Sequence, residues 1–220
     1  MVRSFDGRAL PPEVVERIVS NAQRAPSAGF SQGWAFLVLS GAEQTQAYWD
    51  AVGPANADQF RWQDLYKAPL LIVCLSHKAA YLDRYAEPDK GWTDRSEAHW
   101  PAPYWDIDTG MAAMLMLLTA VDAGLGALFF GIPVAKLDAF HSAFGVPDAY
   151  SPIGTVAVGY AEPDDPPSPS LKRGHRPASD VIHHGHWTVR TKLDGHPEFM
   201  PPEFVDQARR PRRNLLTLVA

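Results

Sequence analysis

Residues 105–131, WDIDTGMAAMLMLLTAVDAGLGALFFG, decide the fold of this chain. The first part, 105–123, is apolar almost all round, which predicts a helix buried at the centre of a core. Gly124 follows at the position where a glycine commonly ends a helix. The apolar run 127–132 then predicts a strand. This segment therefore predicts the central helix of the fold and the strand that follows it.

Helical and strand patterns alternate outward from this segment. Residues 11–25 begin with prolines and carry apolar residues at three- and four-residue spacing, which predicts a helix that Pro26 ends. Further strands are expected at 34–39, 69–75 and 152–160, and further helices at 43–51 and 133–144. The alternation indicates an α+β or α/β sandwich with a C-terminal extension.

Two stretches carry no clear period. Residues 77–104 are long for a connection inside a domain and rich in aromatic residues, which favours a lid over something flat and apolar. An excursion with local helix is the alternative, and the sequence leaves both open. From residue 161 the chain is rich in proline and charge. We therefore expect a core at 1–160 and an extended arm at 161–220.

Composition argues against several classes of protein. The net charge of −5 argues against nucleic-acid binding, which usually requires a basic surface. No apolar run reaches the roughly 18 to 20 residues that a membrane helix needs, and the first residues do not form a signal peptide. We therefore expect a cytoplasmic protein that contacts no membrane. The single cysteine, Cys74, excludes an intrachain disulfide, and its apolar neighbours predict a buried, inert thiol.

No set of side chains forms a convincing catalytic site. His183, His184 and His186 cluster in the tail, but no carboxylate or cysteine at ligand spacing completes a site, so no metal is expected. Asp106 and Asp108 fall at the start of the central helix, where acidic residues stabilise the helix dipole without further function. Motifs of serine hydrolases and of phosphate-binding loops are missing from the sequence. We therefore expect no catalytic side chain and a cofactor that supplies the reactivity.

Groups that suit a cofactor phosphate lie near both ends of the chain. Arg3 is near the N-terminus, and guanidinium groups are forked donors that match a phosphate. A basic run in the tail contains Lys172, Arg173, His175 and Arg176. The stretch 25–34, APSAGFSQGW, adds small residues that let backbone approach a ligand. A basic run alone is usually a solvated patch, so both interpretations of the tail stay open.

Four segments resemble the nitroreductase family of FMN-dependent oxidoreductases across roughly residues 1–190. They are VRSF at 2–5, APSAGFSQGWAFLVL at 25–39, the segment 106–131, and IGTVAVGYAEP at 153–163 with KRGHRPASDVIHHGHW at 172–187. The resemblance implies an α/β sandwich with a central mixed sheet flanked by helices. It also implies a homodimer with FMN in the interface, and an arm in which residues 171–187 contact the flavin or wrap the partner.

The resemblance further implies which residues bind FMN. The implied set is Arg3, Arg173, His175 and Arg176 at the phosphate, Pro26, Ser27, Ala28 and Gln32 near the flavin from the neighbouring subunit, and the Gly131 main-chain N–H beside Phe130. Four features depart from the family pattern. Phe30 replaces an asparagine, Gly33 replaces a proline, and Met1 stands at a serine with the preceding arginines missing. Either the true start lies upstream, or the protein holds FMN with fewer donors. The second cation of the arm falls on His175, which would bind a phosphate well only when protonated, and the neighbouring Arg176 could substitute for it.

The activity that the resemblance implies is ping-pong hydride transfer. NADH or NADPH would reduce the flavin, and a small electron-poor acceptor such as a nitroaromatic or a quinone would then be reduced. Two alternatives stay open. One is a flavin-dependent dehydrogenase or oxidase of one biosynthetic intermediate, with residues 77–105 as its lid. The other is a flavin-poor binding or storage protein.

Overall fold

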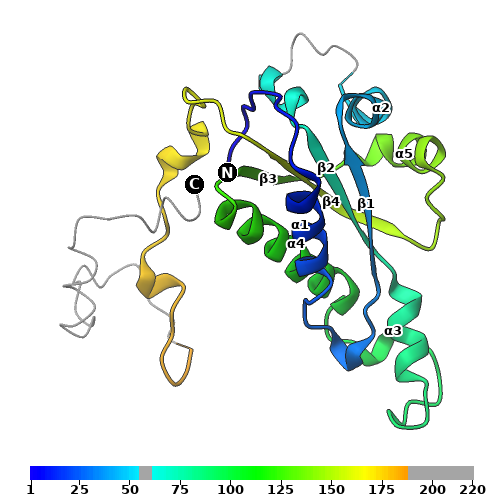
Figure 1. The fold of residues 1–220 in the computed structure, drawn as a ribbon. Coiled ribbons are helices and arrows are strands. Elements are labelled where there is room, and N and C mark those ends of the chain that lie inside the picture. The colour runs from blue at the N-terminus through cyan, green and yellow to red at the C-terminus, as the bar shows by residue number, and fades with distance from the viewer. Residues whose placement is uncertain (55–60, 188–220) are drawn as a thin grey trace. The chain divides into compact units, whose positions relative to one another are not determined.

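The computed structural model describes residues 1–54 and 61–187. Two compact units are present, of which the first comprises Met1–Asp165 and the second begins at Pro166. The α-helices and strands of the described residues all lie in the first unit (Figure 1). They are α1 Pro12–Ala22, β1 Trp34–Ser40, α2 Ala42–Val52, β2 Leu70–Ser76, α3 Lys78–Tyr85, α4 Tyr104–Asp122, β3 Gly126–Phe130, α5 Leu137–Phe144 and β4 Ser151–Gly159.

The four strands form one sheet in the order β1-β2-β4-β3. Each neighbouring pair runs antiparallel, with Trp34 opposite Ser76 in the first pair and Leu70 opposite Val158 in the second. The predicted α+β sandwich is therefore confirmed. The predicted mixed sheet is wrong for the described strands, because no two neighbours run parallel.

Helices cover both faces of the sheet. β2 is buried along its whole length, and its side chains alternate between two cores. Leu71 and Val73 pack on the side of α2 and α5, whereas Leu70 and Ile72 pack on the side of α1 and α4. Figure 1 shows the same arrangement, with α1 and α4 on one face and α2 and α5 on the other. A sandwich of helix, sheet and helix is thus built around β2.

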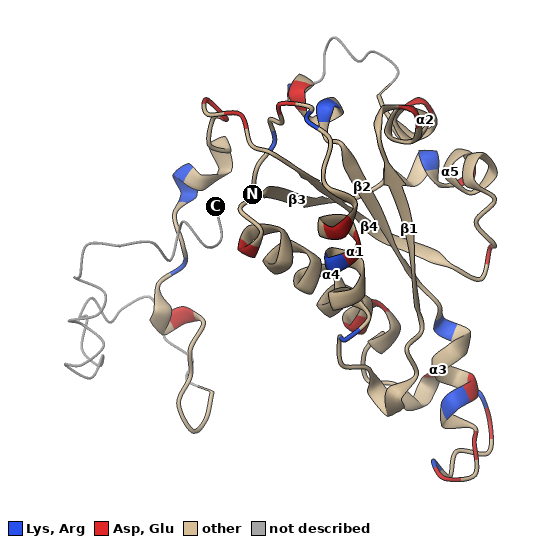
Figure 2. Ribbon diagram, viewed as in Figure 1, with Lys and Arg blue, Asp and Glu red and all other residues tan. Residues whose placement is uncertain are grey.

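Helix α4 is the long helix that the sequence predicts, and its C-terminus has the expected cap. Gly124 adopts a φ of 73°, and its N–H donates to the carbonyl of Val121 at 2.9 Å. The helix is not buried all round within one chain, however. Ile107, Met111, Met114 and Leu118 are 36 to 53% exposed. Their spacing of four, three and four residues places them on one face of the helix, and α4 is uncharged along most of its length (Figure 2).

Two expected boundaries differ from the structure. The segment 77–104 contains helix α3, so the alternative with local helix applies to its first part. The sequence hides α3 because Tyr81 is its only buried residue, which leaves no apolar period to detect. The helix expected at 133–144 begins as a 3-10 turn at Val134–Lys136 and becomes α-helical only in α5. In the described parts of the chain no helix is long and apolar enough to cross a membrane.

Cys74 lies in the middle of β2 and is fully buried. Burial raises the pKa of its thiol to about 12, so the reactive thiolate is scarce at any physiological pH. We expect the native protein to react with a thiol reagent such as DTNB at about pH 8 far more slowly than the urea-unfolded protein. Equal rates in the two states, measured by absorbance, would contradict this packing.

The second unit is described only over residues 166–187. These residues contain two 3-10 turns, Pro169–Arg173 and Ala178–Asp180. Most of their side chains are exposed. The part of the predicted arm from 188 to 220 lies outside the described residues.

Candidate functional site

The loop between α1 and β1 has an unusual backbone. Gly29, Phe30 and Gln32 adopt φ values of 61°, 54° and 49°, in the left-handed region that only glycine enters easily. The N–H of Phe30 donates to the carbonyl of Ser27 at 3.0 Å. The N–H of Gln32 donates to the Ser27 hydroxyl oxygen at 3.0 Å. These bonds fold residues 27–32 into a compact turn, which we call the cofactor loop after the role that the sequence analysis predicts for it.

Asp108 of α4 anchors the cofactor loop through a hydrogen bond to its backbone. Its carboxylate is 1% exposed and accepts the N–H of Ala28 at 2.8 Å. The hydroxyl of Tyr81 donates to the same carboxylate oxygen at 2.9 Å. The neighbouring Asp106 accepts from the Ser76 hydroxyl at 2.6 Å. The dipole interpretation fits Asp106, which lies in the first turn of α4, but it does not account for Asp108, which lies beyond that turn and binds the loop.

Gly33 ends the cofactor loop where no side chain fits. Its carbonyl accepts the N–H of His77 at 2.9 Å. A Cβ at this position would lie 2.8 Å from the His77 carbonyl oxygen and would collide with the ring of Tyr81. The departure from the family proline thus has a local cause, because Tyr81 and the backbone before α3 occupy the space.

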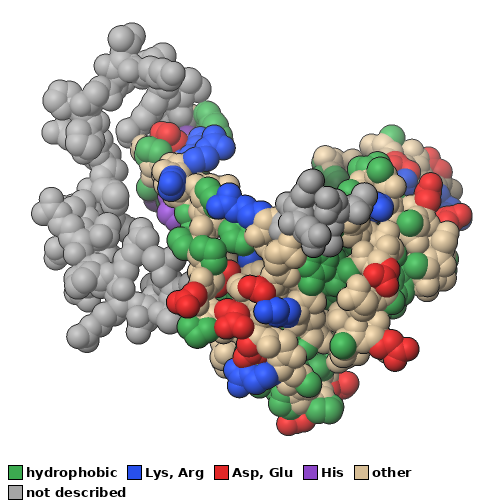
Figure 3. All heavy atoms as spheres, turned by 90° about the horizontal axis from the view of Figure 1, so that it is seen from above, with side chains coloured by type: hydrophobic (Ala, Val, Ile, Leu, Met, Phe, Trp, Pro, Cys, Tyr) green, Lys and Arg blue, Asp and Glu red, His purple; other side chains and the backbone are tan. Residues whose placement is uncertain are grey.

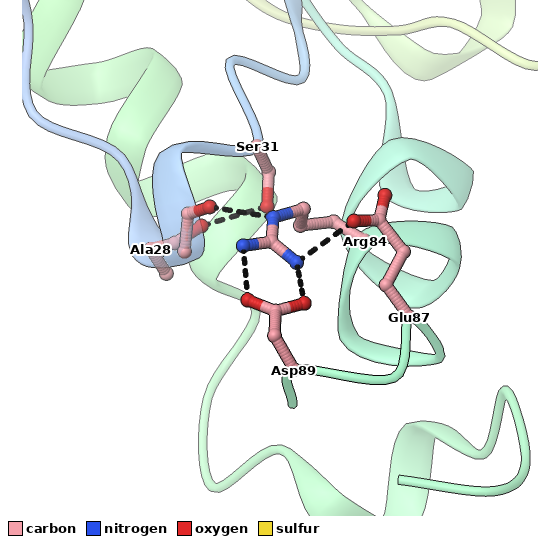
Figure 4. A network of polar contacts seen from close by, with 6 residues as sticks. Ala28, Ser31, Arg84, Glu87 and Asp89 are labelled. Carbon is pink, nitrogen blue, oxygen red and sulfur yellow. Dashed lines mark hydrogen bonds and ion pairs between the residues drawn. The ribbon is translucent and has the colours of Figure 1, made fainter. Parts of the chain in front are cut away.

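Arg84 of α3 holds the outer side of the loop (Figure 4). Its Nε donates to the carbonyl of Gly29 at 3.0 Å. Its two terminal nitrogens bind both oxygens of Asp89 at 2.7 Å, and one of them also binds Glu87 at 3.0 Å. This bidentate pairing lowers the pKa of Asp89. Arg84 therefore joins the cofactor loop to the turn after α3.

An aromatic cluster packs beside Arg84. Tyr85 lies with its ring centroid 4.7 Å from that of Trp92 and 4.5 Å from that of Trp100. The Tyr85 ring also lies against Gly29, close enough to exclude a Cβ there. The cluster of Tyr85, Trp92 and Trp100 thus packs against the cofactor loop through Tyr85.

The predicted loop residues are close together, whereas Arg3 is far from them. Pro26 and Gln32 are exposed, and Ser27 and Ala28 are half-buried. Arg3 lies beyond the opposite end of the sheet, because the preceding Val2 donates to Ala127 of β3. Helix α4 runs between these two ends, and its 19 residues give a length of roughly 28 Å at about 1.5 Å per residue. One chain therefore does not bring Arg3 and the cofactor loop into one site.

The surroundings of Arg3 leave its guanidinium available for an anion. It lies 5.3 Å from the centre of the Trp62 ring and donates to the Met1 carbonyl at 3.5 Å. No ion pair to it is present among the described residues. The chemistry of this group fits the phosphate of a cofactor.

Phe130 and Gly131 differ in accessibility. The Phe130 ring stacks on Trp49 at 5.6 Å between centroids and belongs to the core on the side of α2. Gly131 follows at the end of β3, is exposed, and has open space where a Cβ would lie. Gly131 is therefore the accessible member of this predicted pair.

The predicted cations of the second unit are all exposed. Arg173 ends the 3-10 turn Pro169–Arg173, and His175 and Arg176 follow Gly174. One terminal nitrogen of Arg176 donates to the carbonyl of Asp180 at 3.1 Å. Arg176 is thus partly used within its own unit.

The structure adds residues that the sequence analysis missed or misinterpreted: Tyr81, Arg84 and Asp108. One signal for Asp108 was available. It is the fifth residue of α4, beyond the first turn to which the dipole argument applies. Tyr81 and Arg84 gave no comparable signal, because the groups through which they hold the loop, the Asp108 carboxylate and the Gly29 carbonyl, are distant from them in sequence.

Charges and metal ligands do not define a second site. Within the described residues no group of three or more histidine, cysteine or acidic side chains could hold a metal ion. On much of the face drawn in Figure 3, acidic and basic side chains lie next to one another. The cofactor loop and its anchors are therefore the best-defined candidate site.

Known proteins are similar to this chain in fold and in sequence. A protein of Methanothermobacter thermautotrophicus with the name "Putative NADH dehydrogenase/NAD(P)H nitroreductase" is 25% identical over 72% of this chain and 71% of its own length. A solved nitroreductase family protein from Clostridium difficile 630 has a TM-score of 0.61 at 22% identity, covering 84% of this chain and 93% of that one. A nitroreductase from B. subtilis has a TM-score of 0.65 at 21% identity, covering 86% of this chain and 72% of that one. The model of the Nitroreductase family matches residues 1–160, and the chain belongs to that family.

Proposed function

We propose that this protein is an FMN-dependent oxidoreductase that takes hydride from NADH or NADPH and passes it to an electron-poor acceptor, a nitroaromatic or a quinone, by a ping-pong mechanism. Membership of the nitroreductase family supports an oxidoreductase, and the name of the archaeal relative adds NAD(P)H as donor. The observation that carries the proposal is the cofactor loop, a strained turn anchored from two sides.

The residues of this chain would bind and orient the cofactor. FMN, when bound, supplies the hydride-accepting and hydride-donating chemistry. Arg3, Arg173 and His175 would hold its phosphate, with Arg176 as a further cation. Ser27 accepts the Gln32 N–H, which leaves its own proton to donate to the ring system. Gly131 is exposed, and its main-chain N–H would be a further donor to the ring system.

We further propose that the site is completed by a second copy of the chain. The apolar stripe of α4, made of Ile107, Met111, Met114 and Leu118, is the surface that would be covered. A two-fold axis through the middle of this stripe makes the two α4 helices antiparallel. The cofactor loop of one chain then meets the Arg3 end of the other, so the dimer unites the two halves that one chain keeps apart. Residues 171–187 of the predicted arm would contact the flavin or wrap the partner in this dimer.

The proposal is tested by the visible spectrum of the purified protein with and without added FMN. We expect flavin absorption that bleaches when NADH or NADPH is added without oxygen, and the more effective nucleotide identifies the donor. A nitroaromatic or a quinone should then restore the absorption. A protein that FMN cannot titrate would refute the proposal.

The aromatic cluster favours one second candidate, a flavin enzyme with a narrow substrate range. Tyr85, Trp92 and Trp100 form a packed cover rather than an open surface beside the loop. A slow NAD(P)H oxidation that broad acceptors fail to accelerate would favour a dehydrogenase or oxidase of one intermediate. Rapid turnover with several unrelated acceptors would favour the first proposal.

A further inference from the structure

The cofactor loop is held in a conformation that its own sequence does not favour. Phe30 and Gln32 are not glycines, yet both have positive φ, as does Gly29 between Ala28 and Phe30. Such residues persist only where the surrounding structure fixes them. The contacts that fix the loop therefore decide whether it exists in this shape before a ligand binds.

We infer that Asp108 is the positioning residue that pre-forms the cofactor loop, and that it acts together with Tyr81. The inference rests on the proposed function for its consequence, since the loop is proposed to contact FMN. Asp108 acts through the loop backbone and would not touch the cofactor itself. Its bond to the Ala28 N–H lies one residue before the left-handed stretch begins.

One carboxylate oxygen of Asp108 accepts both hydrogen bonds, from the loop and from Tyr81. The Oδ2 atom of Asp108 accepts the Ala28 N–H at 2.8 Å and the Tyr81 hydroxyl at 2.9 Å. Both side chains are buried, with Asp108 1% and Tyr81 0% exposed. Burial, and then the hydrogen bond to Asp108, raise the pKa of Tyr81, so its hydroxyl remains a donor. The pair therefore ties three elements together: α3, α4 and the loop.

Arg84 restrains the next residue from the opposite direction. Its Nε binds the Gly29 carbonyl at 3.0 Å, and Asp89 and Glu87 hold its guanidinium in place (Figure 4). The adjacent residues Ala28 and Gly29 are thus bound through their N–H and carbonyl groups respectively. Arg84 is more exposed than Asp108, with a quarter of its side chain accessible. The buried Asp108 should therefore provide the stronger restraint.

A loop that is ordered in advance binds more tightly, because the ligand does not have to order it. Loss of the Asp108 oxygen should release the Ala28 N–H and allow the left-handed residues to relax. The expected effect is weaker FMN binding without unfolding of the sandwich, since the two cores around β2 do not involve Asp108.

Two substitutions at residue 108 separate the effect of the accepting oxygen from the effect of the negative charge. Asp108→Ala removes the oxygen, whereas Asp108→Asn keeps a carbonyl oxygen that can accept from both Ala28 and Tyr81. We expect Asp108→Ala to weaken FMN binding about tenfold or more, the size of effect seen when the hydrogen-bond partner that orients a metal ligand is removed. Asp108→Asn should restore most of the affinity. Asp138→Ala is the matched control, because Asp138 is an exposed residue of α5, on the opposite face of the sheet from α4.

Hydrogen exchange in the FMN-free protein measures the loop directly. We expect the amides of residues 28–32 to exchange about tenfold or more faster in Asp108→Ala than in the wild type, with β2 amides unchanged. Tyr81→Phe, which keeps the ring and loses one donor, should show a smaller increase in the same residues. It also provides the test should Asp108→Ala fail to fold.

The outcomes distinguish this inference from the proposed function. Wild-type protein that does not bind FMN refutes the proposed function, while exchange in the FMN-free variants still tests the loop. Loop amides that exchange at the wild-type rate in Asp108→Ala would overturn the inference. If the wild type binds FMN, an Asp108→Ala protein with the same affinity for FMN would also overturn it. Asp108→Asn behaving like Asp108→Ala would also overturn the assignment to a single accepting oxygen.

Discussion

Replacing Met114 with glutamate is expected to leave a folded monomer that has lost FMN binding. Met114 is 53% exposed and lies in the middle of the apolar stripe of α4. Next to a two-fold axis, each substitution places one carboxylate close to its copy, in a surface that offers no cation between Asp108 and Asp122. An unpaired charge in a buried interface costs about 3 to 5 kcal/mol, which is more than a hundredfold in affinity.

Two measurements check this expectation. Analytical ultracentrifugation should show the monomer mass for Met114→Glu and the dimer mass for the wild type. Titration with FMN should show binding by the wild type and no binding by Met114→Glu. Ala47→Glu is the matched control, because Ala47 is an exposed residue of α2 on the opposite face of the sheet. A Met114→Glu protein that remains dimeric would exclude the α4 stripe as the interface. A monomer that still binds FMN tightly would show that one chain holds a complete site.

The elements that the sequence predicts well are those with a strong pattern. The apolar run of α4 and its glycine cap lie where the sequence analysis expects them, and so do β1, β2 and β4. α3 was missed because its packing is aromatic and involves one buried residue, so hydrophobic periodicity carries no signal there. The direction of strand pairing was also mispredicted, because a mixed and an antiparallel sheet share the same strand patterns.

The candidate site was predicted in part. The loop 25–34 was identified from its small residues and from its resemblance to a family motif, both of which are local in sequence. Its anchors are long-range: Asp108 lies 80 residues from Ala28, and Arg84 lies 55 residues from Gly29. The position of Asp108 beyond the first turn of α4 argues against a role at the helix dipole, but it does not show whether the side chain faces water or a buried amide. Only the packing of α3 and α4 against the loop separates these two possibilities.

Restoring the family proline at residue 33 is expected to destabilise this protein. A Cβ at Gly33 would lie 2.8 Å from the His77 carbonyl oxygen and would meet the Tyr81 ring. The residue before a proline is driven to extended backbone, whereas Gln32 has a φ of 49°. Overpacking of this kind predicts a loss of about 1 to 3 kcal/mol in the free energy of unfolding.

A double-mutant cycle in urea identifies the source of this loss. Gly33→Ala adds the Cβ alone, and Tyr81→Ala removes the ring that it meets. Because the two residues are in contact, their effects on the free energy of unfolding should not add. We expect Gly33→Ala to cost about 1 to 3 kcal/mol in the wild-type background and clearly less in the Tyr81→Ala background, where only the His77 carbonyl remains close. If the two effects on the free energy of unfolding add fully, contact with the Tyr81 ring is not the reason that residue 33 must be glycine. A Gly33→Pro protein as stable as the wild type would show that this loop can adopt the family's conformation, and that the left-handed backbone at Gln32 is not required.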